Sequence, residues 1–337
     1  MARVAVFFGG KSGEHEVSCA SAVSTVAALR SKGHDVVTVG IDHFGEFHLA
    51  DSTTDPLLAE GPTVQLEVPG GRLLGHGTPV EVDVAFPVLH GPYGEDGTIQ
   101  GLFEMAGLAY VGSGVLGSAI AMDKDVAKRL CRAAGIPVGQ YMVVRRGDFL
   151  TAPGDVVDQI GGDLGYPLFV KPANLGSSVG ISRAADESSL KDAIHLALEH
   201  DRKVLVEAEV KGREIEVAVL EGPRASVPGE IIVASGWYTY DAKYRDDATR
   251  IEVPAALSDA ATEMVRDLAC RAFTALECSG LARVDFFYEE GGRGFLLSEV
   301  NTMPGFTSRS MFPMMWEATG LGYAELCDEL VAMALDR

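Results

Sequence analysis

Residues 296–310, LLSEVNTMPGFTSRS, and the run just before them, 282–288, ARVDFFY, decide how the rest of the chain is interpreted. Both runs have the composition of strands, and a Gly-rich turn at 291–294 separates them. A hairpin of this kind places Asp285, Glu299 and Asn301 within reach of one another. Two carboxylates and an amide are oxygen ligands of the kind that Mg²⁺ prefers. The hairpin is therefore predicted to hold a metal ion.

A cation and a glycine accompany this candidate metal site. Arg283 lies on the first strand, and Gly305 follows the second, where it lets backbone come close to a ligand. A metal beside an arginine and a glycine-lined wall indicates a place where phosphate charge is handled. The alternative is that these are cross-strand polar residues on an exposed face, but the apolar neighbours at 286–287 and 296–297 alternate poorly for that.

The composition limits the possible partners. The chain has 337 residues, with 28 Lys and Arg against 48 Asp and Glu, so its net charge is −20. A surface this acidic argues against nucleic acid and anionic membranes as partners, and it commonly serves solubility. The longest apolar runs, such as 82–89, are strand-length, and residues 1–8 lack signal-peptide features. We expect a cytoplasmic protein whose five cysteines are reduced core thiols.

The order of the elements predicts an α/β protein. An apolar run at 3–8 ends at a glycine turn, an amphipathic pattern covers 14–30, and a second strand follows at 36–41, which indicates a βαβ unit with a parallel sheet. Further strands are predicted at 82–89, 139–144, 167–171, 181–184, 203–207, 213–220 and 231–234. Helices are predicted at 98–105, 123–134, 186–200, 258–278 and 322–335.

The glycine turn at 8–12, FGGKS, does not form a known nucleotide motif. Gly10-Lys11-Ser12 match the end of a P-loop, but position 5 is Ala, and G-x-G-x-x-G also fails. The turn places Glu14 at a helix N-terminus. Two interpretations of Glu14 stay open: a favourable interaction with the helix dipole, or a carboxylate that binds a substrate ammonium.

Three further stretches are candidates for nucleotide contacts. In 169–180, FVKPANLGSSVG, a strand ends at Lys171 and a small-residue loop follows, which suits phosphate oxygens but is also compatible with a surface hairpin. In 204–214, Glu207 and Glu214 could accept from an adenine amine and ribose hydroxyls, or lie at solvated strand ends. The long polar loop 235–250 is functional or disordered.

Seven motifs resemble, in order, those of the D-alanine–D-alanine ligases, members of the ATP-grasp superfamily. They are GGKSGEHEVS from Gly9, HGPYGEDGTIQG from His90, MDK from Met122, KPANLGSSVG from Lys171, DAKY from Asp241, ARVDFF from Ala282 and SEVNTMPGFTS from Ser298. The resemblance implies a three-domain ATP-grasp fold, α/β and in part α+β, with a Rossmann-like parallel-sheet N-terminal domain. The implied domains are 1–112 for substrate, 113–209 for the central ATP-grasp part, and 210–337 with the metal site and a lid at 235–250.

The resemblance also implies a reaction in two steps. The carboxylate of one D-alanine attacks the γ-phosphate of ATP, and the amine of a second D-alanine attacks the resulting acyl phosphate to form D-alanyl-D-alanine for peptidoglycan. Cations must surround the reacting anions, and a lid must exclude water from the acyl phosphate. The implied cofactors are ATP and two Mg²⁺, with Mn²⁺ as a substitute, and the implied assembly is a homodimer.

In the family pattern, Glu14 binds the first ammonium and is linked through Ser177 to Tyr244 of the lid. Arg283 and the N–H of Gly305 form the oxyanion hole. The implied substrate-binding residues also include His90, a candidate base near the second amine, together with Ser310 and Met311. The implied nucleotide-binding residues are Lys124, Lys171, Ser177, Ser178, Glu207, Val210, Glu214, Lys243, Phe287 and Asn301. The implied metal ligands are Asp285, Glu299 and Asn301.

Three alternatives remain at the level of the sequence. The retained Lys243-Tyr244 pair resembles the D-alanine type rather than ligases that accept D-lactate, but His15 stands where the family often has Arg. Another ATP-grasp ligase, for example one that makes a D-alanyl-D-serine-like or a specialised bond, would share the motifs. A nucleotide-binding regulator would keep the fold and leave Arg283 idle.

Overall fold

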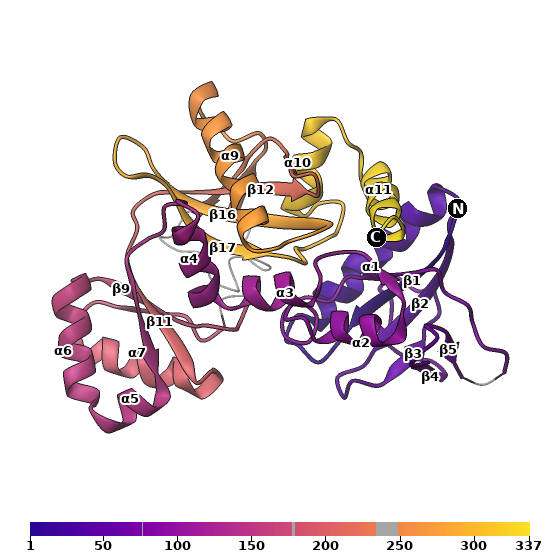
Figure 1. The fold of residues 1–337 in the computed structure, drawn as a ribbon, viewed down its shortest axis with the longest axis horizontal. Coiled ribbons are helices and arrows are strands. Elements are labelled where there is room, and N and C mark those ends of the chain that lie inside the picture. Colours follow the sequence, from indigo (N-terminus) through magenta and orange to yellow (C-terminus); the bar gives the residue numbers. More distant parts are fainter. Residues whose placement is uncertain (76, 177–178, 234–248) are drawn as a thin grey trace.

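The computed structural model describes residues 1–75, 77–176, 179–233 and 249–337. Three sheets with flanking helices follow one another along the chain, and Figure 1 shows them as three masses joined by α3 and α4 at the centre. The expected α/β class is confirmed. Within the described ranges, no helix combines the length and the apolarity needed to cross a bilayer.

The first sheet has seven strands in the order β5-β4-β3-β2-β1-β6-β7. The β1, β2, β6 and β7 strands run parallel and β3 to β5 antiparallel, so the predicted βαβ unit is confirmed. The bounds are β1 Arg3–Gly9, α1 His15–Ser31, β2 Asp35–Ile41, β3 Phe47–Leu49, β4 Thr63–Leu66, β5 Leu73–Leu74, β6 Val84–Pro87, α2 Thr98–Ala106 and β7 Ala109–Tyr110. Because β1 and β6 are parallel neighbours, the loops after them meet at one edge of the sheet, where ligands commonly bind in such folds.

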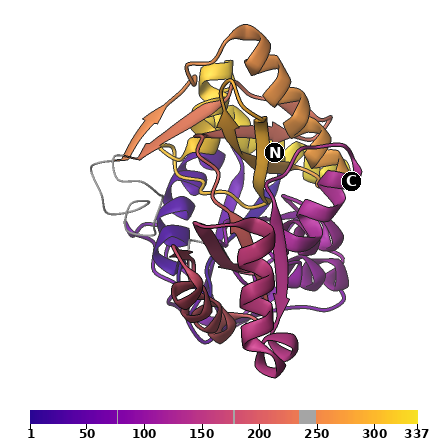
Figure 2. The same ribbon diagram turned by 90° about the vertical axis from the view of Figure 1, so that its left-hand side faces the viewer.

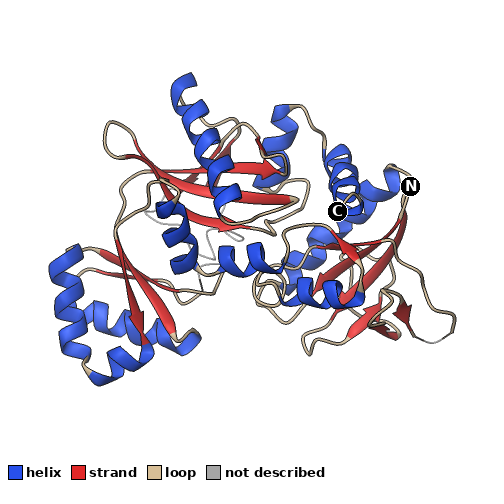
Figure 3. Ribbon diagram, viewed as in Figure 1, coloured by secondary structure: helices blue, strands red, loops and turns tan. Residues whose placement is uncertain are grey.

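The second sheet is small and antiparallel, in the order β10-β9-β11-β8. Helices cover its outer face, as Figures 1 and 3 show, and its apolar core contains side chains from both layers. The bounds are β8 Tyr141–Arg145, α5 Arg146–Thr151, α6 Pro153–Leu164, β9 Leu168–Pro172, β10 Ser182–Ala184, α7 Glu187–His200 and β11 Lys203–Ala208.

The third sheet follows the order β15-β14-β12-β16-β17, with β13 paired to β12. Its bounds are β12 Arg213–Leu220, β13 Arg224–Ala225, β14 Gly229–Val233, β15 Thr249–Glu252, β16 Leu281–Glu289 and β17 Gly294–Asn301, with α9 at Asp259–Ala275. One face of β12 packs in the core below α9 through Ile215, Val217 and Val219. Ala218 and Leu220 are buried as well, in a second core on the other side of the sheet.

Four helices connect these layers: α3 Val115–Met122, α4 Lys124–Ala133, α10 Met311–Thr319 and α11 Tyr323–Leu335. The chain ends by returning to its beginning, because α11 packs on α1 and both termini lie on the same side in Figures 1 and 2. The expected start of α4 is confirmed: Asp123 is its N-cap and accepts a hydrogen bond from the Val126 amide at 3.1 Å. The five cysteines are all free thiols, as expected.

Candidate active site

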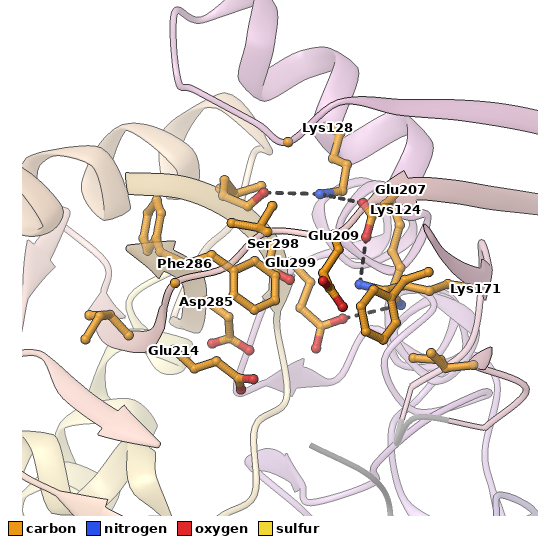
Figure 4. Close-up of a pocket in the computed structure, with 18 of the residues that line it drawn as sticks. Lys124, Lys128, Lys171, Glu207, Glu209, Glu214, Asp285, Phe286, Ser298 and Glu299 are labelled. Carbon is orange, nitrogen blue, oxygen red and sulfur yellow. Dashed lines mark hydrogen bonds and ion pairs between the residues drawn. The ribbon is translucent and has the colours of Figure 1, made fainter. Parts of the chain in front are cut away.

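A cavity of about 370 Å³ lies between the second and third sheets. It is lined by β9 and β11 of the second sheet, by β12, β16 and β17 of the third, and by α4, which packs on β17, and Figure 4 shows side chains from each of these elements directed into it. Of the residues predicted to bind nucleotide or metal, the lining includes Lys124, Lys171, Glu207, Val210, Glu214, Asp285, Phe287 and Glu299. Sequence positions more than 170 residues apart therefore meet here.

The candidate metal ligands lie side by side because of the strand register. Asp285 on β16 faces Glu299 on β17, and in the next row of the same pair Arg283 faces Asn301. Residues two apart on a strand point to the same face, so all four side chains share one face of the hairpin. Asn301 Oδ1 also accepts a hydrogen bond from the Met303 amide at 2.9 Å, which fixes the turn after β17. The predicted grouping of these residues is confirmed; their binding of a metal stays a prediction.

Arg283 is buried against two carboxylates. Its Nε and Nη2 donate to the two oxygens of Asp285 at 2.8 and 2.7 Å, and Nε lies 3.0 Å from Glu216 Oε2. Burial lowers the pKa of the guanidinium, but the attraction of Asp285 and Glu216 outweighs burial and raises that pKa well above its ordinary value. Arg283 therefore stays a cation inside the cavity wall. The sequence did not indicate Glu216 as part of this site.

Lys124 on α4 forms an ion pair with one of the carboxylates of the candidate metal site. Lys124 Nζ donates to the Leu175 carbonyl at 2.6 Å and lies 3.4 Å from Glu299 Oε2 (Figure 4). The pair joins α4 and the loop after β9 to the hairpin of β16 and β17, which carries the candidate metal ligands and is called the metal hairpin below. A cation and a carboxylate that pair in the lining of a cavity can both be redirected to an incoming anion and its counterion.

A buried ion triad forms the floor of the cavity, and the sequence predicted only two of its members. Glu207 Oε2 lies 2.7 Å from Lys171 Nζ, and Glu207 Oε1 lies 2.9 Å from Lys128 Nζ (Figure 4). Lys128 also donates to the Leu297 carbonyl at 3.1 Å. Its spacing of four from Lys124 places both on one face of α4, which is the only sequence signal that could have found it.

The triad perturbs all three pKa values. Burial raises the pKa of Glu207, but the attraction of Lys128 and Lys171 prevails and lowers that pKa to about 2 from an ordinary value of 4.5. Burial lowers the pKa of Lys128, and Glu207 restores it only in part. For Lys171 the attraction of Glu207 outweighs burial and raises the pKa. At the floor of the cavity, two lysines are therefore paired with a single ionised carboxylate, that of Glu207.

This arrangement predicts how stability depends on pH. Because the pKa of Glu207 is depressed in the folded protein, its contribution to the free energy of unfolding is fully present above pH 4.5 and is lost as the pH falls toward 2. Glu207→Gln should therefore cost about 3–5 kcal/mol at pH 7, as for breaking a buried ion pair, and much less at pH 3. Urea unfolding at both pH values measures this.

A matched control lies on the same part of the chain. Glu209→Gln removes a carboxylate that is paired with the more exposed Arg183, so it should cost less than about 1 kcal/mol at either pH. If the two variants lost the same free energy of unfolding at pH 7, the predicted stabilisation by the buried triad would be contradicted.

Glu14 and His90 lie at the edge of the first sheet where the β1 and β6 loops meet. Glu14 is the N-cap residue of α1 and is buried. Ser12 links the two loops, because its hydroxyl donates to the His90 carbonyl at 2.6 Å and accepts from the Glu14 amide at 3.2 Å. A Cβ placed on Gly176, which lines the cavity, would lie 3.7 Å from Glu14 Oε2. This edge therefore borders the loop after Lys171.

The imidazole of His90 is held on both sides. Nδ1 lies 2.9 Å from the Met303 carbonyl, and Nε2 lies 3.2 Å from Ser21 Oγ. A carbonyl can only accept, so Nδ1 donates to the Met303 carbonyl, and Nε2 forms the second hydrogen bond with the Ser21 hydroxyl. His90 thereby ties the first sheet to the turn after β17.

The remaining predicted residues follow β17. Gly305 lies beside Ser310, since a Cβ on Gly305 would lie 3.3 Å from Ser310 Oγ. That hydroxyl accepts from the Thr307 amide at 3.1 Å, and Ser310 is the N-cap residue of α10. Met311 begins α10, and its side chain is buried in the core. These residues and Glu14, His90 and Asn301 lie outside the lining of the cavity itself. Ser177, Ser178, Lys243 and Tyr244 lie outside the described residues, as does most of the predicted lid.

Two sheets that enclose a cavity lined with lysines and carboxylates are the arrangement of the ATP-grasp class. Two family models match the chain: "D-ala D-ala ligase N-terminus" over residues 3–113 and "D-ala D-ala ligase C-terminus" over residues 130–332. The chain belongs to the D-alanine–D-alanine ligase family.

Individual relatives agree with this assignment. A D-alanine–D-alanine ligase of Arthrobacter sp. (strain FB24) is 47% identical over 99% of this chain and 94% of its own length. The solved D-alanine-D-alanine ligase of Coxiella burnetii is 34% identical with a TM-score of 0.87, covering 100% of this chain and 94% of that one. The VanG D-Ala:D-Ser ligase of Enterococcus faecalis is 36% identical with a TM-score of 0.87, covering 99% of both chains.

Proposed function

We propose that this chain joins two D-alanine molecules to D-alanyl-D-alanine at the expense of ATP, as a step in making peptidoglycan precursors. Family membership supports the class of reaction. The observation that carries the proposal furthest is the cavity itself, in which Lys124 and Lys171 face Asp285 and Glu299. Cations opposite paired carboxylates suit a nucleotide triphosphate and its metal ions.

The donor set fits Mg²⁺. Asp285, Glu299 and Asn301 would hold two ions, with Mn²⁺ as a substitute, because their oxygens are hard ligands on adjacent rigid strands. The charge balance is also suitable, since Arg283 and Lys124 already neutralise carboxylates that would otherwise repel one another. When bound, the metal would neutralise charge on the phosphates and orient them.

In the first step the carboxylate of one D-alanine attacks the γ-phosphorus of ATP. A carboxyl oxygen–phosphorus bond forms, the bond to ADP breaks, and an acyl phosphate results. Glu14 would hold the ammonium of this D-alanine, since it is a buried carboxylate beside the loop after Lys171. Lys124 and Lys171 would bind phosphate oxygens. Glu207, Val210, Glu214 and Phe287 would hold the adenosine part from the cavity wall, and Ser177, Ser178 and Lys243 would approach the phosphates.

In the second step the amine of the other D-alanine attacks the acyl carbon. A C–N bond forms, phosphate leaves with the electrons of the broken C–O bond, and the attacking amine loses a proton. Arg283 and the N–H of Gly305 would stabilise the tetrahedral oxyanion. Ser310 and the N-terminus of α10 at Met311 would bind the carboxylate of the second D-alanine. Tyr244 would be linked through Ser177 to Glu14, which would hold the lid, residues 235–250, closed and exclude water.

His90 fits a positioning role better than that of the base, because both ring nitrogens have partners in the resting protein. His90→Asn, whose amide can still donate to the Met303 carbonyl, should lower kcat by less than about tenfold, whereas loss of a general base costs about 10²–10⁴. Steady-state rates of the variant from pH 6 to 10 measure this. If the rise of kcat with pH that reports a general base disappeared from the pH–rate profile, the positioning role would be contradicted.

The function is tested by its products. Purified protein with ATP and Mg²⁺ should release ADP and phosphate only when D-alanine is present, with D-alanyl-D-alanine seen by mass spectrometry. D-serine and D-lactate are added in competition, because the similarity to a D-Ala:D-Ser ligase makes D-serine the strongest rival second substrate. Predominant D-alanyl-D-serine would overturn the substrate assignment, and no D-alanine-dependent ADP would overturn the reaction.

Three further properties belong to this proposal. We expect a cytoplasmic homodimer, which light scattering on purified protein tests. We also expect the three domains at 1–112, 113–209 and 210–337, which limited proteolysis tests by cleavage near 112 and 209.

A further inference from the structure

Three carboxylates, not two, form one row across the third sheet. Glu216 on β12 faces Asp285 on β16, which in turn faces Glu299 on β17. All three line the cavity, and Glu216 is among the buried charged residues. Like charges on directly opposite strand positions repel, so such a row needs cations between its members.

Arg283 is the cation between the first two members. Both of its hydrogen bonds to this pair go to Asp285, while Glu216 Oε2 lies 3.0 Å from Nε as an ion-pair contact. The side chains of Arg283 and Glu216 are 8% and 7% exposed. A small rotation of the guanidinium would therefore transfer its Nε–H from one carboxylate to the other without exposing the charge.

The arginine competes with a metal for Asp285. In the resting arrangement both oxygens of Asp285 accept from Arg283, so an ion that binds Asp285 shares these oxygens with the guanidinium and weakens their attraction for it. A buried guanidinium left without an anion would carry a large desolvation cost. A second carboxylate at ion-pair distance removes that cost.

We propose that Glu216 is a positioning residue that receives Arg283 when Asp285 turns to the metal, and so keeps the guanidinium buried and directed at the reacting carbonyl. This inference rests on the proposed function, because it assigns Glu216 to the same metal and oxyanion site. The competing interpretation is structural: Glu216 would only fasten β12 to β16. The two interpretations differ in their prediction for metal affinity, because only the positioning role makes metal binding weaker when Glu216 is replaced.

The test is Mn²⁺ affinity, measured by the EPR signal of free Mn²⁺ with a saturating non-hydrolysable ATP analogue. Glu216→Gln should weaken Mn²⁺ binding on the order of tenfold to a hundredfold, the equivalent of one charged hydrogen bond. It should also lower kcat while the KM for ATP changes little. Unchanged Mn²⁺ affinity in a folded variant would overturn the inference.

Glu209→Gln is the matched control, because Glu209 also lines the cavity but pairs with Arg183 and has no part in the proposed metal or nucleotide contacts. If loss of negative charge alone weakened metal binding, Glu209→Gln would match Glu216→Gln and the inference would fail. A double-mutant cycle adds a second criterion: in an Arg283→Met background, Glu216→Gln should no longer change Mn²⁺ affinity. If Glu216→Gln still weakened Mn²⁺ binding in that background, Glu216 would act on the metal directly, as a ligand or through its charge, and the inference would be overturned.

Thermal unfolding of each variant keeps the outcome interpretable, and Glu216→Asp replaces Glu216→Gln if the latter does not fold. The shorter side chain should give a smaller loss of Mn²⁺ affinity in the same direction, and no loss would count against the inference. Wild-type protein that binds no Mn²⁺ with the nucleotide analogue would instead overturn the proposed function. The two failures are thus separated by the wild-type measurement.

Discussion

Arg283→Ala should lower kcat for dipeptide formation on the order of 10²–10³-fold, the loss seen when an oxyanion donor is removed. The guanidinium is buried, stays charged, and is fixed by Asp285 at 2.7 and 2.8 Å, so it is preorganised before substrate arrives. No neighbouring side chain on the same face can replace it, since position 218 opposite it on β12 is Ala. Coupled ADP release under saturating D-alanine and ATP measures the effect.

The same substitution should also destabilise the fold, because it leaves Asp285 and Glu216 facing each other without their shared cation. Removing one partner of a buried ion pair costs about 3–5 kcal/mol, and added Mg²⁺ should recover part of this. Arg283→Lys keeps the charge but loses the two-pronged donor, so it should restore stability more than rate. A variant that folds with kcat within threefold of wild type would contradict the oxyanion role of Arg283.

Arg293→Ala is the control on the same hairpin. Arg293 pairs with Glu289 at 2.6 Å near the turn, and its side chain is 46% exposed. Its removal should change neither kcat nor stability measurably, because exposed ion pairs contribute about 0–1 kcal/mol. Equal effects of the two arginine variants would mean that the hairpin responds as a whole and that the oxyanion role is wrong.

The metal hairpin illustrates what the sequence could predict. Its strands, turn and polar face were all predicted, because the glycine turn and the strand composition are local signals. The poor alternation of apolar residues has a local cause that only the structure reveals: the register shifts between Asp285 and Phe286, so Phe286 pairs with Leu297 and Ser298 is passed over. A bulge of this kind re-aims side chains, which is why they are frequent beside active sites.

Partners distant in sequence could not be predicted. Lys128 looks like a solvated helix residue, since buried lysines are rare, and its partner Glu207 is 79 residues further along the chain. Glu216 lies two residues after Glu214 on β12, but its contact with Arg283 depends on how β12 and β16 align. Propensity gives the face of a strand, whereas the register that joins two strands is set by tertiary packing.

Some helices were not predicted for a different reason. The α6 helix contains Gly161 and Gly162, which weaken the helical signal, and α10 has Pro313 in its first turn. Proline is tolerated there because the first amides of a helix have no intrahelical partner. In both helices apolar side chains packed on a sheet supply the stability that local propensity does not.

Glu299→Gln should reduce activity at 1 mM Mg²⁺ on the order of 10²-fold or more, and high Mg²⁺ should restore part of it. Glu299, a proposed metal ligand, faces Asp285 across the strand pair and lies 3.4 Å from Lys124 Nζ. The amide keeps the shape but removes one of the negative charges that a hard cation requires. The variant should therefore need more Mg²⁺ for half-maximal rate while its KM for D-alanine stays near the wild-type value.

Two measurements separate this effect from damage to the fold. Mn²⁺ affinity should fall together with the rate, because the lost group is a ligand and not only a partner of Lys124. Glu289→Gln on the partner strand β16 should leave both quantities unchanged, since Glu289 pairs with Arg293 at the far end of the hairpin. If Glu299→Gln instead raised the KM for ATP at unchanged Mn²⁺ affinity, Glu299 would act by holding Lys124 in place. The metal site would then have to be assigned to Asp285 and Glu216, which are adjacent in the same row.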